Sequence, residues 1–233
     1  MTNSDITHDE DFDDEDFDDE DFEDEDFEDE DDEEEFDPGE TYVAVCPVDP
    51  ELARQVVELA ELNWDDRAAV NRAVRGFGWR GGRAVPVDEG RFVTAQGHVG
   101  YGHDCLYLPF AHCYQIDGEV WTKDFWGSLP GWSSEKGAYR PEFDGHVETA
   151  VARFTELLGP PESDVRVEGR NVSVGSYSWR YAAWRRGGNV IVVGQTLDGF
   201  SYSQYEEAVV YIGRLSEEAP LPEGAEFRNF LKW

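Results

Sequence analysis

The chain has 233 residues, and its 53 Asp and Glu against 19 Lys and Arg give a formal net charge of −34. Residues 1–40 contain 26 of these acidic residues and no Lys or Arg, so the other 193 residues carry 27 acidic and 19 basic residues, a net charge of −8. This charge repels nucleic acid and anionic membranes, which excludes direct binding to either and predicts a basic protein as the partner. No motif has the specificity of a P-loop, a zinc ribbon or a protease triad.

The charge divides the chain into an acidic tail, residues 1–40, and a body, residues 41–233, of a size that favours a single domain. The longest apolar runs, such as Val190–Val193, are far shorter than the roughly 20 residues of a membrane-spanning helix. The first residues lack the basic and apolar regions of a signal peptide, and three cysteines favour reduced thiols. We therefore expect a cytoplasmic protein.

The tail is a low-complexity repeat in which Asp and Glu surround regularly spaced phenylalanines over residues 9–36. Phe12, Phe17, Phe22 and Phe27 recur every five residues, a spacing that gathers them on one face of neither a helix nor a strand. The repeat cannot bury enough apolar area to offset the conformational entropy that the chain loses on ordering. The tail is therefore predicted to be disordered. It either keeps the protein soluble or mimics a polyanion, with phenylalanine anchors, towards a basic partner. Divalent cation binding is a minor alternative.

Four helices are predicted from capping residues and apolar spacing. They are expected at Pro50–Leu62, from Asp65 or Asp66 to about Gly76, at Gly145–Leu158 and at Ser203–Leu215.

Strands are predicted from runs of β-branched and aromatic residues, and Gly187-Gly188 joins two of these runs as a hairpin turn. Because hairpins dominate, we predict an α+β fold, with a mainly antiparallel sheet and about four helices. The segments 81–90 and 126–143 are expected to be loops. The predicted strands are Tyr42–Val45, Phe92–His98, Cys105–Leu108, Tyr114–Trp121, Val165–Val167, Val172–Val174, Tyr177–Trp184 and Asn189–Leu197.

Residues 67–83 contain five arginines and no acidic residue. They form either a solvated helix face with a following loop or a dock for an anionic ligand or for the protein's own acidic tail. The five are Arg67, Arg72, Arg75, Arg80 and Arg83.

A cluster of histidine and cysteine offers zinc-type ligands at His98, His103, Cys105 and His112. The spacing lacks the close pairs of zinc sites, and Cys113 points away from His112 if both lie on a strand. The alternative is a structural role for these side chains, and we expect no cofactor. A metal-dependent enzyme that uses the region from His98 to Cys113 remains a second hypothesis.

A thiol enzyme would use Cys46 as nucleophile, His98 or His112 as base and Asp117 or Asp124 as the orienting acid. This order of residues resembles that of transglutaminase-like thiol enzymes. The run from His112 to Trp121 resembles the histidine-bearing hairpin of the same family. Cys46 departs from that pattern, because Pro47 follows it and the predicted helix starts later, at Pro50. The other interpretation places Cys46 at the end of a strand.

Aromatic residues are dense between 114 and 143, where Trp121, Trp126 and Trp132 either line a binding surface or belong to the core.

The C-terminal third, with Phe154–Pro161, Trp179, Trp184 and Asn189–Val193, resembles small actinobacterial α+β families, some of them immunity partners of toxins. The resemblance implies a compact cytosolic domain and an immunity-like role, and it transfers no functional residue. The leading hypothesis is therefore a non-enzymatic binding or inhibitor-like protein whose tail and body engage a basic protein, such as a toxin nuclease or a nucleic-acid-binding protein. The alternatives are the two enzymes above and a globular domain with a solubilising tail.

Overall fold

The computed structural model describes residues 40–81, 90–102, 104–116, 124–168, 178–197 and 205–231. All of them belong to one unit, Asp37–Trp233, while Met1–Phe36 form a separate unit outside the described residues. The predictions for the acidic repeat, for Val172–Val174 and for most of the loop 81–90 therefore concern residues that are not described here.

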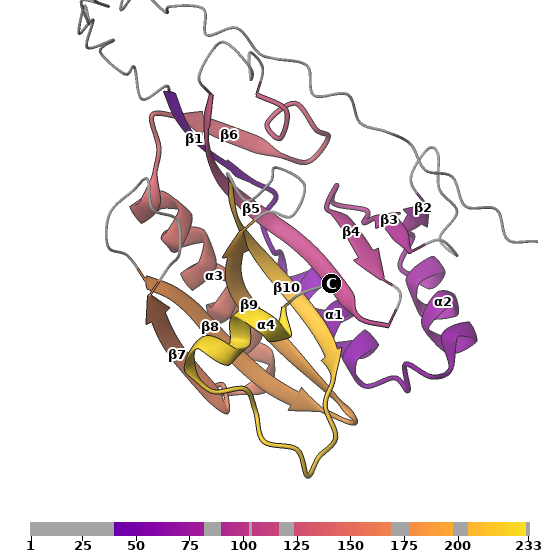
Figure 1. Ribbon diagram of the computed structural model, residues 1–233. Coiled ribbons are helices and arrows are strands. Elements are labelled where there is room, and N and C mark those ends of the chain that lie inside the picture. The colour runs from indigo at the N-terminus through magenta and orange to yellow at the C-terminus, as the bar shows by residue number, and fades with distance from the viewer. Residues whose placement is uncertain are drawn as a thin grey trace, which may run out of the picture. The chain divides into compact units, whose positions relative to one another are not determined.

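The described residues form a ten-stranded sheet in which every strand pair is antiparallel (Figure 1). The main path runs in the order β2-β3-β4-β5-β10-β9-β8-β7, and β1 pairs with both β5 and β6. With its helices, this sheet confirms the α+β class. The strands are β1 (Glu40–Val45), β2 (Arg80–Gly81), β3 (Arg91–Val93), β4 (Val99–Gly102), β5 (Leu106–Ile116), β6 (Ser133–Lys136), β7 (Ser163–Glu168), β8 (Ser178–Arg186), β9 (Asn189–Leu197) and β10 (Glu206–Arg214).

The first two helices confirm their predicted places because their caps form as the sequence indicates. At α1 (Pro50–Ala60), Oδ1 of Asp49 accepts a hydrogen bond from the Leu52 backbone N at 2.6 Å. At α2 (Arg67–Gly76), Asp66 accepts from Ala69 N at 2.9 Å.

The third helix, α3 (Arg140–Leu158), begins five residues before the predicted start at Gly145. The predicted loop 126–143 is accordingly wrong in part, because it contains β6 and the first turn of α3. A short 3-10 turn, η3 (Gly224–Glu226), leads into the four-residue helix α4 (Phe227–Phe230).

The prediction of a helix at Ser203–Leu215 is wrong, because residues 206–214 form strand β10. Ala208, Val210 and Ile212 pack on one face of the sheet, and Val209 and Tyr211 pack on the other. A strand covered on both faces has a continuous apolar run, and such a run also satisfies helical spacing.

Strand β5 replaces the two separate strands predicted at Cys105–Leu108 and Tyr114–Trp121. Its Pro109 is tolerated at an irregularity in the pairing with β10, where Ala208 faces Ala111 and Val209 faces Pro109. The predicted strand Phe92–His98 is also shorter, since β3 ends at Val93.

The hairpin prediction is confirmed: β8 and β9 are joined at Gly187-Gly188, and Gly187 has φ +56°. The predicted Val165–Val167 strand lies within β7.

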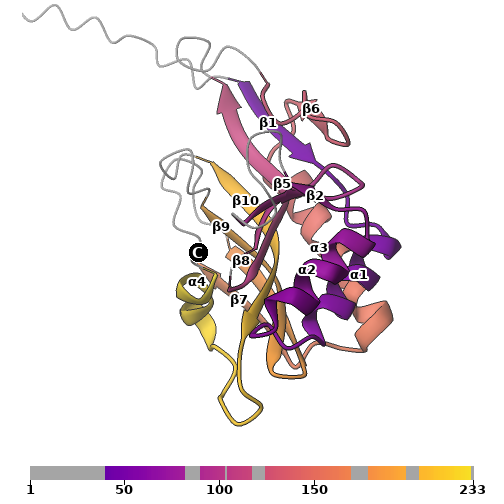
Figure 2. The ribbon, with the colours of Figure 1, turned by 90° about the vertical axis from the view of Figure 1, so that its right-hand side faces the viewer.

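The sheet separates two apolar clusters. Helices α1, α2 and α3 lie on one side of the sheet and α4 lies on the other (Figure 2). On the α4 side, the rings of Tyr181 and Phe227 stack with centroids 5.2 Å apart. Among the helices of the described residues, none has both the length and the apolar character needed to cross a membrane.

Candidate functional site

A third apolar cluster surrounds His112, where β1, β5 and the segment before β6 meet. His112 is 0% exposed, and neither of its ring nitrogens has a hydrogen-bond partner among the residues that the structure describes. The ring of Trp126 stacks on His112 with a centroid separation of 3.7 Å and an interplanar angle of 12°, and Trp132 lies 5.3 Å away. The structure therefore brings together three of the residues that the sequence analysis selected.

Burial lowers the pKa of His112 to about 3, so the imidazole is neutral at pH 7. A neutral imidazole has one N–H donor and one acceptor nitrogen. Leaving both without a partner in the interior is unfavourable, and it sets His112 apart from the hydrogen-bonded histidine described below.

Asp124 anchors the segment that covers His112. Its carboxylate accepts hydrogen bonds from the hydroxyls of Tyr114 and Ser134 and, at 2.8 Å, from Gly127 N. Burial alone would raise the pKa of Asp124, but the hydrogen bonds from Ser134, Tyr114 and Gly127 lower it below its ordinary value. The Asp124 carboxylate therefore fixes the turn from Asp124 to Gly127 against Ser134.

Two buried carboxylates begin β10 next to this cluster. Glu206 and Glu207 are 3% and 2% exposed and lie directly across from Cys113 and His112. Glu207 accepts a hydrogen bond from the Tyr107 hydroxyl. Because directly opposite residues share a face of the sheet, the Glu207 carboxylate and the His112 imidazole lie on the same face.

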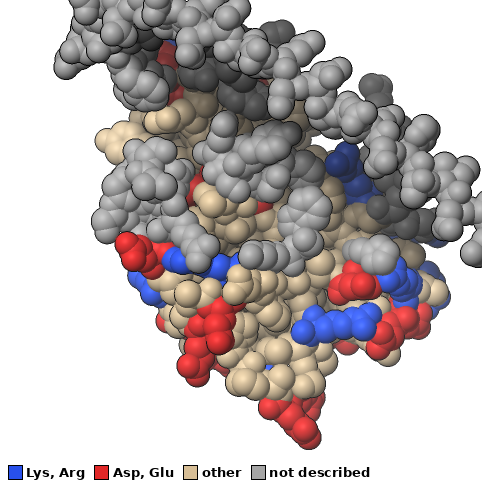
Figure 3. All heavy atoms as spheres, in the orientation of Figure 1, with Lys and Arg blue, Asp and Glu red and all other residues tan. Residues whose placement is uncertain are grey.

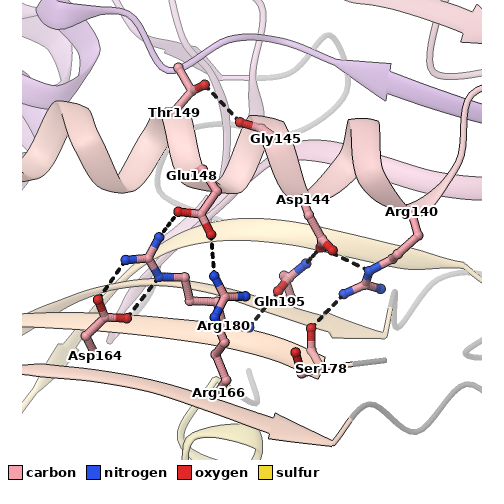
Figure 4. Close-up of polar contacts among 10 residues, drawn as sticks. All are labelled: Arg140, Asp144, Gly145, Glu148, Thr149, Asp164, Arg166, Ser178, Arg180 and Gln195. Carbon is pink, nitrogen blue, oxygen red and sulfur yellow. Dashed lines mark hydrogen bonds and ion pairs between the residues drawn. The ribbon is translucent and has the colours of Figure 1, made fainter. Parts of the chain in front are cut away.

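Arg140, at the start of α3, neutralises Glu206 in a buried ion pair in which the two side chains are 12% and 4% exposed. Trp179 Nε1 donates to the same carboxylate at 2.9 Å. Figure 4 shows that Arg140 also reaches the Ser178 carbonyl, at 3.2 Å, and Asp144, at 3.0 Å. These contacts fix the first turn of α3 to β8 and β10.

A second ion network holds the middle of α3 to the sheet (Figure 4). Glu148 on α3 contacts the guanidinium groups of Arg166 on β7 and Arg180 on β8, and Asp164 contacts Arg180 at 2.7 Å. The hydrogen bond to Asp164 is the main reason why the pKa of Arg180 is raised. The role of this network is therefore structural, because it joins α3 to β7 and β8.

Cys46 occupies a different environment from the one that thiol catalysis requires. Its Sγ donates to the Gln96 carbonyl at 3.6 Å, and burial, assisted by Asp49, raises the pKa of the thiol to about 12. A nucleophilic cysteine needs the opposite shift.

His98 contacts the backbone of Cys46 and not its sulfur. Nε2 lies 2.8 Å from the Cys46 carbonyl, and Nδ1 lies 3.0 Å from the Thr94 hydroxyl. A carbonyl can only accept, so Nε2 carries the proton and Nδ1 accepts from Thr94. Burial lowers the pKa of His98 to about 4. His98 therefore ties the end of β1 to the turn after β3.

The residues proposed for zinc do not form a cluster of ligands in the described part of the chain. No group of three or more His, Cys, Asp or Glu side chains with a metal-binding arrangement occurs there, and His103 lies outside the described residues. Both nitrogens of His98 are already engaged, and Cys105 is half-buried with a pKa raised by burial.

Four of the five arginines selected from the sequence are described, and they lie on the surface. Arg67, Arg72 and Arg75 are exposed on α2, and Arg80 is exposed in β2. Arg67 forms an ion pair with Asp104 at 2.5 Å. Arg83, Trp121 and the four tail phenylalanines lie outside the described residues.

A pocket of about 470 Å³ lies away from all of these residues, between the α1–α2 connection and the ends of β9 and β10. Several of its polar side chains are engaged within the fold: Asn189 donates to the Ala60 and Leu62 carbonyls, and Arg214 contacts Asp65 at 2.7 Å.

Arg140, Glu206 and Glu207 were not selected from the sequence. The two glutamates lie within the helix wrongly predicted at Ser203–Leu215, and they were not among the residues expected to face its interior. The five consecutive apolar residues from Ala208 to Ile212 are the signal that favours a buried strand over an amphipathic helix.

The comparisons with known proteins add no relative. No protein-family model matches the chain, and neither the search of curated proteins nor that of solved structures found a significant match.

Proposed function

We propose that this is a binding protein whose acidic residues 1–40 attract a basic protein partner to a folded α+β unit. The observation that carries the proposal is the segregation of charge, with 26 acidic residues and no Lys or Arg in residues 1–40. Such a segment accelerates encounters with a basic surface through long-range attraction, and Phe12, Phe17, Phe22 and Phe27 supply spaced apolar contacts.

The partner chemistry follows from the charge. A toxin nuclease or another nucleic-acid-binding protein presents a basic site that a polyanion can occupy, which is an immunity-like role. The three cysteines are free thiols, which favours an encounter in the reducing cytoplasm.

The thiol-enzyme alternative has less support. The high pKa of Cys46 and the contact of its Sγ with a backbone carbonyl keep the thiol protonated at pH 7. A tail that serves only solubility is a further alternative, and the experiment below separates it from the proposal.

The test compares the full chain with a variant in which the Asp and Glu of residues 9–36 are replaced by Asn and Gln. We expect the full chain to bind poly-L-lysine with an affinity that falls steeply between 50 and 300 mM salt, and the amide variant to lose that dependence. The same pair, used in pull-downs from cytosol, identifies the partner. Equal affinity of both chains at all salt concentrations would leave the tail with a solubilising role only.

A further inference from the structure

The pocket between the α1–α2 connection and the ends of β9 and β10 combines apolar and acidic side chains. It measures about 470 Å³, and its lining includes Leu62 and Trp64 as well as Glu61 and Asp65. The Trp64 ring is fixed in place, because its Nε1 donates a hydrogen bond to the Leu59 carbonyl at 2.9 Å. Since these residues line the same pocket, they can contact one ligand together.

Glu61 is the acidic residue of this pocket that the fold leaves free. It is exposed at the C-terminal end of α1, and its carboxylate forms no hydrogen bond or ion pair with any residue that the structure describes. The last turn of α1 contains no basic residue, so no side chain of the helix offsets the partial negative charge at this end. Both features favour a cation beside Glu61.

The cations next to the pocket are engaged by acidic residues. Arg214, which lines the pocket, contacts Asp65 at 2.7 Å. Arg185 donates to the carbonyl of Ser216, another lining residue, and forms an ion pair with Glu162 at 3.4 Å. These two arginines therefore leave the charge of Glu61 without compensation.

The loop after β10 adds negative charge close to the pocket. Glu217 and Glu218 directly follow Ser216 and are exposed, and residues 215–227 contain no Lys or Arg. Acidic side chains stand at the lowest point of the view in Figure 3, where this loop lies in Figure 1. A cation that approaches past this loop therefore meets an attractive potential.

We infer that this pocket holds a lysine or arginine side chain of the basic partner, with its aliphatic stem against Leu62 and Trp64 and its charged group beside Glu61. Long basic side chains have an apolar stem and a charged end, and the lining of this pocket offers a surface for each. This inference rests on the proposed function and names the place where the folded unit contacts the partner.

The test uses hexalysine as the probe and the full chain with the amide tail described above, so that the tail no longer contributes. Binding is followed by NMR through the Gly188 amide and the Trp64 indole N–H, since both residues line the pocket. Glu61→Gln should weaken binding about three- to fivefold. Glu58→Gln is the matched control, because it removes the same charge one turn earlier on α1, outside the pocket. At about 150 mM salt, which screens distant charges, it should leave the affinity unchanged.

A second pair of variants fills the pocket without changing the charge. Gly188 lines the pocket, its φ lies outside the left-handed region, and a Cβ added there meets no atom within 4 Å. Gly188→Leu should therefore fold and should weaken binding about tenfold by occupying the space. Gly145→Leu is the control, because a Cβ at this exposed position of α3 also meets no atom within 4 Å and lies outside the pocket.

The charge of the probe is tested separately from its stem. Hexalysine acetylated at every Nζ keeps the aliphatic stems and loses the charges, so it should no longer shift the Gly188 and Trp64 signals.

The outcomes separate this inference from the proposed function. If hexalysine shifts neither signal, or if Glu61→Gln and Gly188→Leu bind it as tightly as their controls do, the pocket is not the contact site. Salt-dependent binding of poly-L-lysine by the acidic chain would then still support the proposed function. If the acidic chain fails to bind poly-L-lysine, the proposed function is overturned and this inference with it.

Discussion

His112 is held in its neutral form by burial alone, and this links the stability of the fold to acid. Its pKa is lowered to about 3 in the folded protein, whereas an unfolded histidine titrates near 6.5. As the pH falls from about 6.5 towards 3, the unfolded chain binds a proton that the folded protein does not bind. The contribution of His112 to stability is thus complete above pH 6.5 and is lost as the solution becomes acidic.

Replacing His112→Phe should remove this acid sensitivity. Between pH 7 and pH 4, the free energy of unfolding of the variant should fall by about 3 kcal/mol less than that of the unsubstituted protein, as measured by urea unfolding. At pH 7 the variant should be equally stable or more stable, because it removes two buried nitrogens that have no partner in the described part of the chain. His98→Phe is the contrasting variant: it leaves the Cys46 carbonyl and the Thr94 hydroxyl unpaired and should destabilise the protein at pH 7. An unchanged pH dependence in His112→Phe would contradict this account.

Cys46 allows a direct test of thiol chemistry. With a pKa of about 12 and 1% exposure, its thiol should react with iodoacetamide at pH 8 only as fast as the protein opens. Peptide mapping by mass spectrometry, compared with the urea-unfolded chain, measures this rate. Rapid labelling of Cys46 in the folded protein, with a midpoint near pH 7, would restore the thiol-enzyme hypothesis.

Helix α3 is attached to the sheet by polar contacts as well as by its apolar face. Arg140 and Glu206 form the buried ion pair, and removing one partner of such a pair leaves an uncompensated charge in the interior.

Arg140→Met should therefore lower the free energy of unfolding by about 3–5 kcal/mol. The matched control is Arg153→Met, also on α3, whose ion pair with Glu156 is exposed and should cost less than about 1 kcal/mol. Adding Glu206→Gln to Arg140→Met should recover part of the loss, because the stranded charge disappears. Denaturant unfolding of the four proteins measures these differences. If the two arginine substitutions lower the free energy of unfolding equally, the buried pair contributes no more to stability than the exposed pair.

The elements that the sequence predicts correctly have local signals. Asp49 with Pro50, and Asp66, mark the starts of α1 and α2, and Gly187-Gly188 marks the β8–β9 turn. The errors occur where the partners are distant in the chain. Strand β10 is flanked by β5 and β9, and apolar clusters cover both of its faces. Its residues are therefore apolar on both faces. That pattern alone also fits a helix.

The candidate site shows the same limit. Trp126, Trp132 and His112 were selected separately from composition, but their stacking depends on the turn that Asp124 holds. Glu206 and Glu207 were not selected, because their burial follows from the strand assignment and from Arg140, which lies 66 residues away in the chain. The role of a polar residue becomes visible only once tertiary contacts place it.

At the scale of the whole molecule, charge and apolar contacts should act on different steps of binding. Under the proposed function, long-range attraction by the acidic tail should raise the association rate and should weaken as salt screens it, whereas short-range contacts of Phe12, Phe17, Phe22 and Phe27 should slow dissociation.

The prediction is that the amide tail and a tail with all four phenylalanines changed to Ser affect different rate constants for poly-L-lysine. The amide variant should associate at least about tenfold more slowly at low salt, with a smaller difference at 300 mM salt. The Phe12→Ser, Phe17→Ser, Phe22→Ser and Phe27→Ser variant keeps the charge, so it should associate normally and dissociate faster. Stopped-flow mixing at several salt concentrations measures both constants. Because neither change touches Asp37–Trp233, the unfolding free energy of that unit should stay the same and serves as the control. If the phenylalanine variant dissociates at the original rate, the rings are not anchors and the tail acts through its charge alone.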